Sequence, residues 1–442
     1  MRFNFGSGLI VGAVLLLTGC PPSEVGSRIS QTRGPDKTLR YEDFVYEPHI
    51  RTVQFYRGEN PLSYPFLYLD EPIQLTLEFD ALVPPDTPAD NFWISIVNCD
   101  HEWRPTTLLP LEFLEGINTD RLYEYMRSEN CLVPYIHYEY RFPAEGAFFK
   151  RSGNYLLKVY RAGNENDLIL TRRLIVAQPK IEVEPLMGQA MLASDRRRIQ
   201  RVDFKIKLTA NMPAMFDPNQ DLKVMILQNF RWDNAATELQ PLFATGNTLE
   251  YQFDAGSEFA GGNEYRWLDI RTVRFYPDKI RKIEEVDSVF RVDLYTEKPR
   301  AGNPVSSRPD LNGGYFIDVQ EYQNAEFESD YVWVRFGLAY PKPIPDASVY
   351  VYGQFCGWRC TEENVMTYNA AKSRYEGELL LKQGVYNYAY AVRKEDRRLA
   401  EESTMEGTHF QTENYYTILV YFAPMGTRSP ELLGVSHINY VY

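Results

Sequence analysis

The chain has 442 residues, 44% of them apolar and 24% charged, a composition typical of folded proteins that excludes disorder over most of the length. Its 32 tyrosines, 25 phenylalanines and 6 tryptophans make it 14% aromatic, and aromatic residues favour strands, so the composition predicts a β-rich fold. The net charge of −13 excludes a nucleic-acid partner and adsorption to anionic lipid, because both require a basic surface.

The N-terminus has the features of a secretory signal peptide. Arg2 provides a positive start, and the apolar run 9–17 that follows is too short to span a bilayer. The run leads into Leu17-Thr18-Gly19-Cys20, which fits the lipobox of bacterial lipoproteins. We therefore predict that residues 1–19 are removed and that Cys20 carries the lipid, which leaves 423 residues with a net charge of −14. The alternative is an ordinary signal peptide with an incidental cysteine.

Residues 20–40 are polar after two prolines, Pro21 and Pro22, and predict a tether between the lipid and the folded part. Lipid chains contribute roughly 0.8 kcal/mol per buried CH₂, so an acylated Cys20 would anchor the protein firmly. No aspartate follows Cys20 and no acidic cluster lies directly after it. We predict an outer-membrane protein that is lipid-anchored on the periplasmic face.

The rest of the chain is patterned mainly as strands. Apolar and polar residues alternate over 73–79, 202–208 and 332–338, which indicates strands with one buried face. Three other runs are apolar on both faces: 169–176, 223–227 and 417–422. Helical periodicity occurs only at 108–114 and 119–126, where Leu122, Tyr125 and Met126 would share one face. Two short helices are predicted there.

Proline- and glycine-rich segments of the chain predict its domain boundaries. Gln178-Pro179 ends a strand, and a loop rich in proline and glycine opens at residue 298. Many short strands separated by turns favour β-sandwiches. We predict an all-β fold of three consecutive immunoglobulin-like or early-set sandwich domains, with short helices inserted in the first. Their ranges are 41–178, 179–298 and 299–442.

Four cysteines remain after Cys20, namely Cys99, Cys131, Cys356 and Cys360. In an oxidising compartment they allow three pairings, and proximity favours Cys99–Cys131 with Cys356–Cys360. A metal site built from Cys99, His101, Cys131 and His137 is the alternative, but their spacings match no zinc pattern. We expect possible disulfides and no metal.

No nucleophile elbow, phosphate loop, zinc-protease or calcium-loop pattern occurs in the chain. The acidic neighbours Glu284-Glu285, Glu362-Glu363 and Glu401-Glu402 would point to opposite faces of a strand and could not share a substrate. A pair of carboxylates distant in sequence remains open as a glycosidase site. We predict no enzymatic activity, no cofactor and no small-molecule substrate.

The segment 349–390 resembles the early-set sandwich of glycogen-binding modules. It has a strand, a Gly-x-Phe turn, Trp358, two further strands and a closing aromatic strand. Such modules stack sugars on exposed aromatic rings, so one hypothesis is that Trp358 binds carbohydrate. The alternative, which we favour, is that Trp358 and the tyrosines 386, 388 and 390 are packing residues, since the three tyrosines share one strand face.

Several segments, taken in order, resemble the plug protein of the Bacteroidetes type IX secretion system. They are 51–56 (RTVQFY), 98–103 (NCDHEW), 152–157 (SGNYLL), 227–233 (LQNFRWD), 259–266 (FAGGNEYR), 381–388 (LKQGVYNY), 406–414 (EGTHFQTEN) and 416–421 (YTILVY). The resemblance covers most of the chain after the tether, and the lipobox is not part of it.

The resemblance implies a protein that closes the periplasmic opening of the outer-membrane translocon barrel when no substrate is being exported. That duty requires a broad contact surface and no chemistry. Tyr, Trp and Arg dominate protein interfaces, so Arg231, Trp232, Trp358, Tyr386 and Tyr388 are the predicted interface residues. The alternative function is that of a lipid-anchored glycan-binding protein in a polysaccharide-uptake system.

Overall fold

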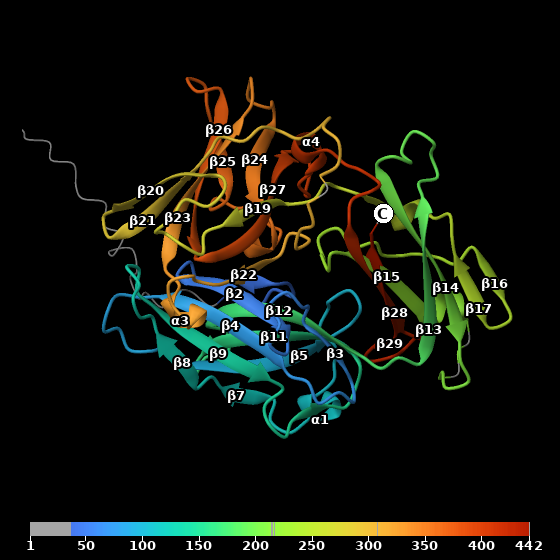
Figure 1. The fold of residues 1–442 in the computed structure, drawn as a ribbon. Helices are drawn as coiled ribbons and strands as arrows, with labels where there is room; N and C mark the ends of the chain where they lie inside the picture. The colour runs from blue at the N-terminus through green and yellow to red at the C-terminus, as the bar shows by residue number, and fades with distance from the viewer. Residues whose placement is uncertain (1–36, 214, 216, 307, 442) are drawn as a thin grey trace, which may run out of the picture. The chain divides into compact units, whose positions relative to one another are not determined.

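The computed structural model describes residues 37–213, 215, 217–306 and 308–441, and almost all of its regular structure is strand (Figure 1). This confirms the predicted all-β class. The signal peptide, Cys20 and the tether up to residue 36 lie outside the described residues.

The first part of the chain forms two sheets. One sheet has the strand order β1-β12-β11-β5-β7, with β3 added in parallel to β12, and the other has the order β2-β4-β9-β8. The strands are β1 (Phe44–Val45), β2 (Ile50–Arg57), β3 (Phe66–Tyr68), β4 (Leu75–Leu82), β5 (Phe92–Cys99), β7 (Thr119–Arg121), β8 (Glu124–Arg127), β9 (Tyr135–Phe142), β11 (Gly153–Arg161) and β12 (Leu168–Ala177). Two short strands, β6 (Leu114–Glu115) and β10 (Phe148–Phe149), pair beside them.

The two sheets enclose one apolar core. Leu75, Leu77 and Phe79, which alternation predicted to face inward, are fully buried and pack in one cluster with Phe92 and Ile94. The opposite positions of β4 and β9 are polar, so the outer face of this sheet carries the charged side chains to which the sections below return.

The middle of the chain contributes to two sheets, and the C-terminal strands complete one of them. One sheet has the order β13-β14-β17-β16 with β18 beside β14, and a three-stranded sheet has the order β15-β28-β29. The strands are β13 (Ile181–Gln189), β14 (Ile199–Leu208), β15 (Leu222–Gln228), β16 (Phe243–Thr245), β17 (Thr248–Tyr251), β18 (Glu258–Ala260), β28 (Asn414–Phe422) and β29 (Glu431–Tyr440). Figure 1 shows the red strands β28 and β29 beside the green β15.

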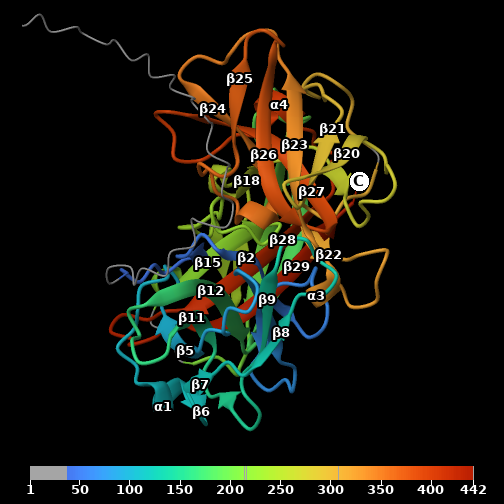
Figure 2. The ribbon, with the colours of Figure 1, turned by 90° about the vertical axis from the view of Figure 1, so that its left-hand side faces the viewer.

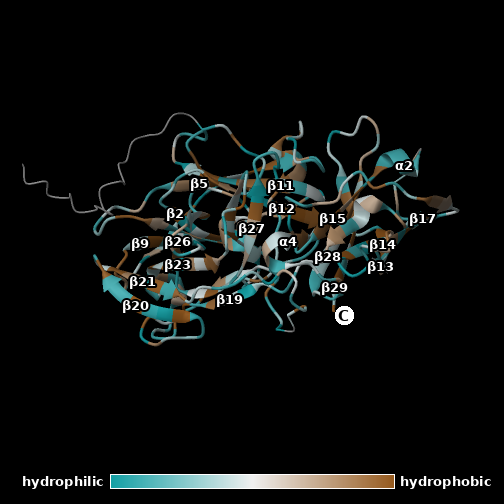
Figure 3. Cartoon of the chain, turned by 90° about the horizontal axis from the view of Figure 1, so that it is seen from above, coloured by the Kyte–Doolittle hydropathy of each residue, from teal (hydrophilic) through white to brown (hydrophobic). Residues whose placement is uncertain are grey.

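The sheet β15-β28-β29 is covered on both faces. Ile226 and Ile418 belong to the core shared with β14, whereas Leu227 and Leu419 belong to a second cluster shared with β11 and β12. Strands buried on both sides need apolar residues at successive positions. This explains the continuous apolar runs of the sequence, and Figure 3 shows β15 mainly in brown for that reason.

The remaining strands form a nine-stranded sheet with the order β19-β27-β24-β25-β26-β23-β21-β20, and β22 pairs with β27. They are β19 (Arg266–Asp269), β20 (Ile280–Val286), β21 (Val289–Leu294), β22 (Tyr315–Ile317), β23 (Tyr331–Ala339), β24 (Ala347–Tyr352), β25 (Val365–Asn369), β26 (Arg374–Lys382) and β27 (Gly384–Lys394). Its core contains Val332, Val334 and Phe336 from the predicted alternating run.

Helices are short in the described residues. They are α1 (Pro110–Phe113), α2 (Pro218–Asp221), α3 (Ala325–Glu328) and α4 (Ser403–Glu406), with 3₁₀ turns at Ala255–Ser257 and Gln354–Cys356. None of the helices in the described part of the chain is long and apolar enough to span a bilayer.

One of the two predicted helices is confirmed and the other is wrong. The helix α1 lies within the predicted 108–114, but 119–126 forms the strands β7 and β8. Leu122 is buried whereas Tyr125 and Met126 are exposed, so the three residues do not share one face. Pairing with β9, which places Tyr125 opposite Tyr138, takes precedence over the weak helical period.

Strand pairing crosses two of the predicted domain ranges. The strand β15 pairs with β28, and β19 pairs with β27, so the ranges 179–298 and 299–442 exchange strands. The division into three consecutive domains therefore stays a prediction.

Candidate functional site

Exposed apolar side chains gather in the first part of the chain, around two terminal strands. The strands β7 and β8 each pair with a single neighbour and so end their sheets, and two residues connect them (Figure 2). We call residues 119–127 the β7–β8 edge. All four residues of β8 are exposed, and Tyr123, between the strands, is 66% exposed. An open strand edge offers unpaired backbone groups to a binding partner.

Further exposed apolar residues lie close to this edge in sequence, on α1, β10 and their loops. They are Leu109, Leu111, Ile117, Leu132 and Phe148. Large exposed apolar groups of this kind mark interaction surfaces. A second exposed aromatic group, Phe275, Tyr276 and Tyr295, lies at the loop before β20 and after β21.

A buried ion pair joins the first pair of sheets to the nine-stranded sheet. Asp80 of β4 accepts a hydrogen bond from Lys382 Nζ at 2.7 Å and another from the Tyr331 hydroxyl at 2.7 Å. His137 Nδ1 lies 2.8 Å from the other oxygen of Asp80. Burial alone would raise the pKa of Asp80, but Lys382 and His137 together hold it below its ordinary value. Asp80 therefore stays ionised and holds the two sheets together.

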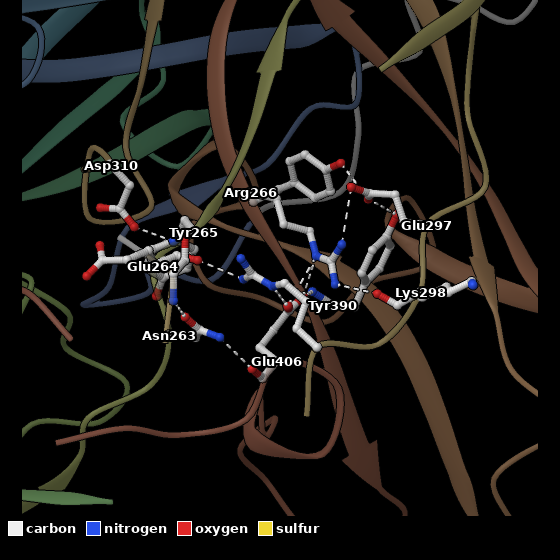
Figure 4. A network of polar contacts seen from close by, with 12 residues as sticks. Asn263, Glu264, Tyr265, Arg266, Glu297, Lys298, Asp310, Tyr390 and Glu406 are labelled. Atoms are coloured by element: carbon white, nitrogen blue, oxygen red, sulfur yellow. Dashed lines mark hydrogen bonds and ion pairs between the residues drawn. The ribbon is translucent and has the colours of Figure 1, made fainter. Parts of the chain in front are cut away.

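A second buried network joins β19, β27 and α4 (Figure 4). Arg266 forms ion pairs with Glu406 at 2.9 Å and with Glu297 at 3.1 Å. Arg300 Nε donates to the second oxygen of Glu406 at 2.6 Å, and the Tyr390 amide donates to the first at 2.8 Å. Two of the family-like segments, 259–266 and 406–414, thus meet here through interactions that fix structure.

Glu297 is the second carboxylate of this network. It accepts hydrogen bonds from the hydroxyls of Tyr388 at 2.7 Å and Tyr390 at 2.9 Å. Burial would raise the pKa of Glu297, but Arg266 and Lys279 lower it to about 2. A carboxylate held ionised and fully hydrogen-bonded is suited to a structural role and is a poor proton donor.

Two further carboxyl groups, Glu264 and Asp310, lie together beside this network. Asp310 accepts backbone hydrogen bonds from Tyr265 and, at 2.6 Å, from Asn312, so the segment 310–313 forms a turn. Burial raises the pKa of Glu264 to about 7, and the carboxyl of Asp310 adds to the rise. Burial raises the pKa of Asp310 as well, whereas the Tyr265 and Asn312 amides lower it.

The predicted interface residues fall into two groups. Arg231 is buried and forms ion pairs with Asp233 at 2.8 Å and with Glu402 at 2.7 Å. Tyr386 and Tyr388 are 2% and 1% exposed. The interface role predicted for these three residues is wrong, because they offer no surface to a partner. Their aromatic and charged character serves the core instead.

Trp358 and Trp232 are partly buried and their interface role stays a prediction. The Arg231 guanidinium covers the Trp358 ring at 4.2 Å from its centre, and a side chain at Gly313 would collide with that ring. Trp232 packs edge-on against Trp103 at 4.9 Å. These contacts favour the packing role of Trp358 over sugar stacking.

The four cysteines are not bonded to one another in the structure, and the possible disulfides stay a prediction. Cys99 lies in the apolar cluster with Trp103 and Leu156, where burial raises the pKa of its thiol to about 12. Cys131 instead contacts the backbone carbonyl of Phe327, in α3. Within the described residues no three His, Cys, Asp or Glu side chains are placed to hold a metal ion.

These features define a class, a multi-sheet β protein whose charged networks lock strands together and whose apolar side chains gather at open strand edges. Such an arrangement suits binding to another macromolecule. Residues 50–178 match the family described as "Type 9 secretion system plug protein 1st domain". This segment is similar to the first domain of type IX secretion plug proteins, which confirms the resemblance found in the sequence. The family is one of plug domains and not one of enzymes.

The fold beyond residue 178 has a counterpart as well. The structure is similar to the crystal structure of a hypothetical protein from Parabacteroides merdae ATCC 43184, with a TM-score of 0.85 and 29% sequence identity. The similarity covers 91% of this chain and all of that one. No curated protein matches the chain. The middle and C-terminal sheets are thus part of a shared architecture.

Proposed function

We propose that the protein is a non-enzymatic plug, which binds the periplasmic opening of the outer-membrane type IX secretion translocon barrel and seals it when no substrate is being exported. The observation that carries this proposal is the match of residues 50–178 to the plug family. The partner is the translocon barrel, and the location is the periplasmic face of the outer membrane.

The buried networks support a sealing role, because a plug must keep its shape against a pore rim. Asp80 and Lys382 are each 1% exposed, and Arg266 and Glu406 are 6% and 1% exposed. Separating one member of such a pair leaves an uncompensated buried charge, which costs about 3–5 kcal/mol. The sheets that these pairs connect therefore move as one body.

The β7–β8 edge is the surface that we assign to the barrel. It lies inside the family-matched segment and combines open strand edges with Tyr123, Tyr125 and Met126. Tyrosine and methionine are enriched at protein interfaces, and a stable contact needs about 800 Å² from each partner. The exposed residues on α1 and β10 are the candidates for extending the surface towards that size.

Lipidation of Cys20 would keep the plug close to its barrel. Lys37 is ion-paired to Glu47 and Asp167, so the tether proposed between the lipid and the body is residues 20–36. These 17 residues span at most about 60 Å, so the anchored body could leave the opening without leaving the membrane. Labelling cells with a palmitate analogue tests the anchor, and a Cys20→Ala variant that is labelled as well as the parent would contradict it.

The plug function is tested by affinity purification from crosslinked cells. We expect the translocon barrel to co-purify, and we expect a deletion strain to admit large solutes only when the barrel is present. An intact permeability barrier after deletion, with no barrel in the purified material, would refute the proposal.

A further inference from the structure

The outer face of the sheet β2-β4-β9-β8 lines a pocket of about 410 Å³. Register places Asp80 opposite His137, Glu78 opposite Glu139 and Thr76 opposite Arg141, all on the face away from the core. Residues from α3 and the end of β26, among them Glu326 and Lys382, line the other side. The pocket therefore lies where the first part of the chain meets the nine-stranded sheet.

His137 presents an unused acceptor to this pocket. The side chain is 4% exposed, and its Nδ1 is engaged with Asp80 at 2.8 Å. Its Nε2 is buried and has no hydrogen-bond partner. The Asp80 carboxylate can only accept, so Nδ1 carries a proton, and in the ring form that binds a cation the lone pair of Nε2 is the acceptor. A buried polar atom without a partner costs free energy that a donor on a ligand would recover.

A row of glutamates crosses the same face. Glu78 of β4 pairs with Glu139 of β9, and Glu139 pairs with Glu124 of β8. Like charges directly opposite each other destabilise a sheet. Arg141 is the only cation beside the row among the residues lining the pocket, and it is shared between Glu139 at 3.1 Å and Glu59 at 3.9 Å. Lys382 is already engaged by Asp80.

The row thus has more carboxylates than cations, since Glu139 shares Arg141 with Glu59. Burial raises the pKa of Glu78, and a cation beside it would favour its ionised form. A metal ion does not suit these carboxylates, since no three ligating side chains of the described residues are placed to hold one. We propose that this pocket binds an organic cation with N–H donors, an ammonium or guanidinium group, with His137 Nε2 as one acceptor and Glu78 and Glu139 as the countercharges. The proposal does not rest on the plug function, although Glu139 and His137 pair with Glu124 and Met126 of the β7–β8 edge.

Calorimetric titration of the full chain with n-butylguanidinium tests the site, with n-butylurea as the neutral ligand of the same shape. We expect saturable binding of the cation and binding of the urea at least ten times weaker. Glu78→Gln and Glu139→Gln should each weaken binding of the cation about tenfold. Both changes relieve a repulsion, so the variants should keep the parent's Tm. The control Glu182→Gln removes an exposed charge from β13 and should bind as the parent does.

A second measurement does not depend on variants. The nitrogen resonance of His137 Nε2 should shift on addition of n-butylguanidinium and stay unchanged with n-butylurea. A peptide with a single arginine between glycines distinguishes the source of the cation. Tighter binding of the peptide indicates a protein side chain, and tighter binding of the free ion indicates a small molecule. Equal binding of both butyl ligands, or equal loss in the Glu182→Gln control, would overturn the proposal.

Discussion

At the scale of single residues, the buried Asp80–Lys382 pair is the interaction whose loss should lower the free energy of unfolding most. Replacing Lys382 by methionine keeps the length of the side chain but leaves Asp80 buried beside His137 without its main countercharge. We expect Lys382→Met to lower the free energy of unfolding by about 3–5 kcal/mol, measured by urea denaturation.

The double variant Asp80→Asn with Lys382→Met removes both charges and should recover most of that loss. The exposed Lys342→Met is the matched control and should change the free energy of unfolding by less than about 0.5 kcal/mol. If the double variant is as unstable as the single one, the cost comes from lost packing and the ion-pair argument fails.

The Glu264–Asp310 pair gives stability a dependence on pH. Burial raises the pKa of Glu264 to about 7, above its value in the unfolded chain, so the folded state binds an extra proton between those two values. Stability from this site is therefore complete below about pH 4.5 and is lost as the pH rises through about 7. We expect denaturation midpoints to fall between pH 5 and pH 8.

The variant Glu264→Gln isolates this contribution. The glutamine oxygen can still accept the hydrogen bond from the Glu413 amide, but it cannot ionise. We expect the decline between pH 5 and pH 8 to flatten and the variant to be the more stable protein at pH 8. An unchanged slope would show that other groups cause it.

At the scale of secondary structure, the sequence patterns predict strands well and helices poorly. The alternation at 73–79 and 332–338 follows directly from one buried face, and both segments form strands. The weak period at 119–126 fails because the decisive partner of Tyr125 is Tyr138, on a strand that no local pattern connects to it. Local periodicity indicates which side chains are buried. At the edge of a sheet, burial depends on the neighbouring strand, which a local sequence pattern does not identify.

The next prediction concerns binding of the translocon barrel by the β7–β8 edge. Tyr123→Asp and Met126→Asp place a charge on exposed positions and should leave the Tm unchanged, because both side chains make little contact with the core. We expect each to reduce recovery of the translocon barrel from crosslinked cells at least fivefold. Phe275→Asp changes an equally exposed aromatic residue outside this edge. If the Phe275 variant loses the barrel and the edge variants keep it, the second exposed group is the contact surface.

At the scale of the whole molecule, the sequence predicts the fold class and the family but not the contacts that assemble the sheets. Lys382 and Asp80 are separated by 302 positions, and neither stands out from an ordinary surface charge in its own segment. Tyr386 and Tyr388 looked suited to an interface because a tyrosine-rich strand face is the same pattern whether it packs inward or binds outward. Only the runs that are apolar on both faces indicated that the sheet β15-β28-β29 is covered on both sides.

The last prediction concerns the C-terminal strands, which pair with a strand from the middle of the chain. The strands β28 and β29 pair with β15, and their side chains fill both the core around Phe204 and Ile226 and the cluster around Leu227. A chain that ends at residue 413 would expose both sets of apolar side chains at once. We expect it to lose amide-exchange protection in β14 and to be cleaved rapidly there by proteases.

The first core offers the internal control for that truncation. Phe79 and its neighbours on β4 pack against β5 and β9 and make no use of β28 or β29 within their cluster. Protection of β4 should therefore persist in the truncated chain, and removal of residues 441–442 alone should change neither strand. If β14 keeps the parent's protection without residues 414–442, the middle sheets fold without the C-terminal strands. The pairing of β28 with β15 would then not be needed for their stability. If β14 and β4 lose protection together, all the sheets unfold as one unit, which would extend to the entire chain the rigidity that we ascribe to the buried ion pairs.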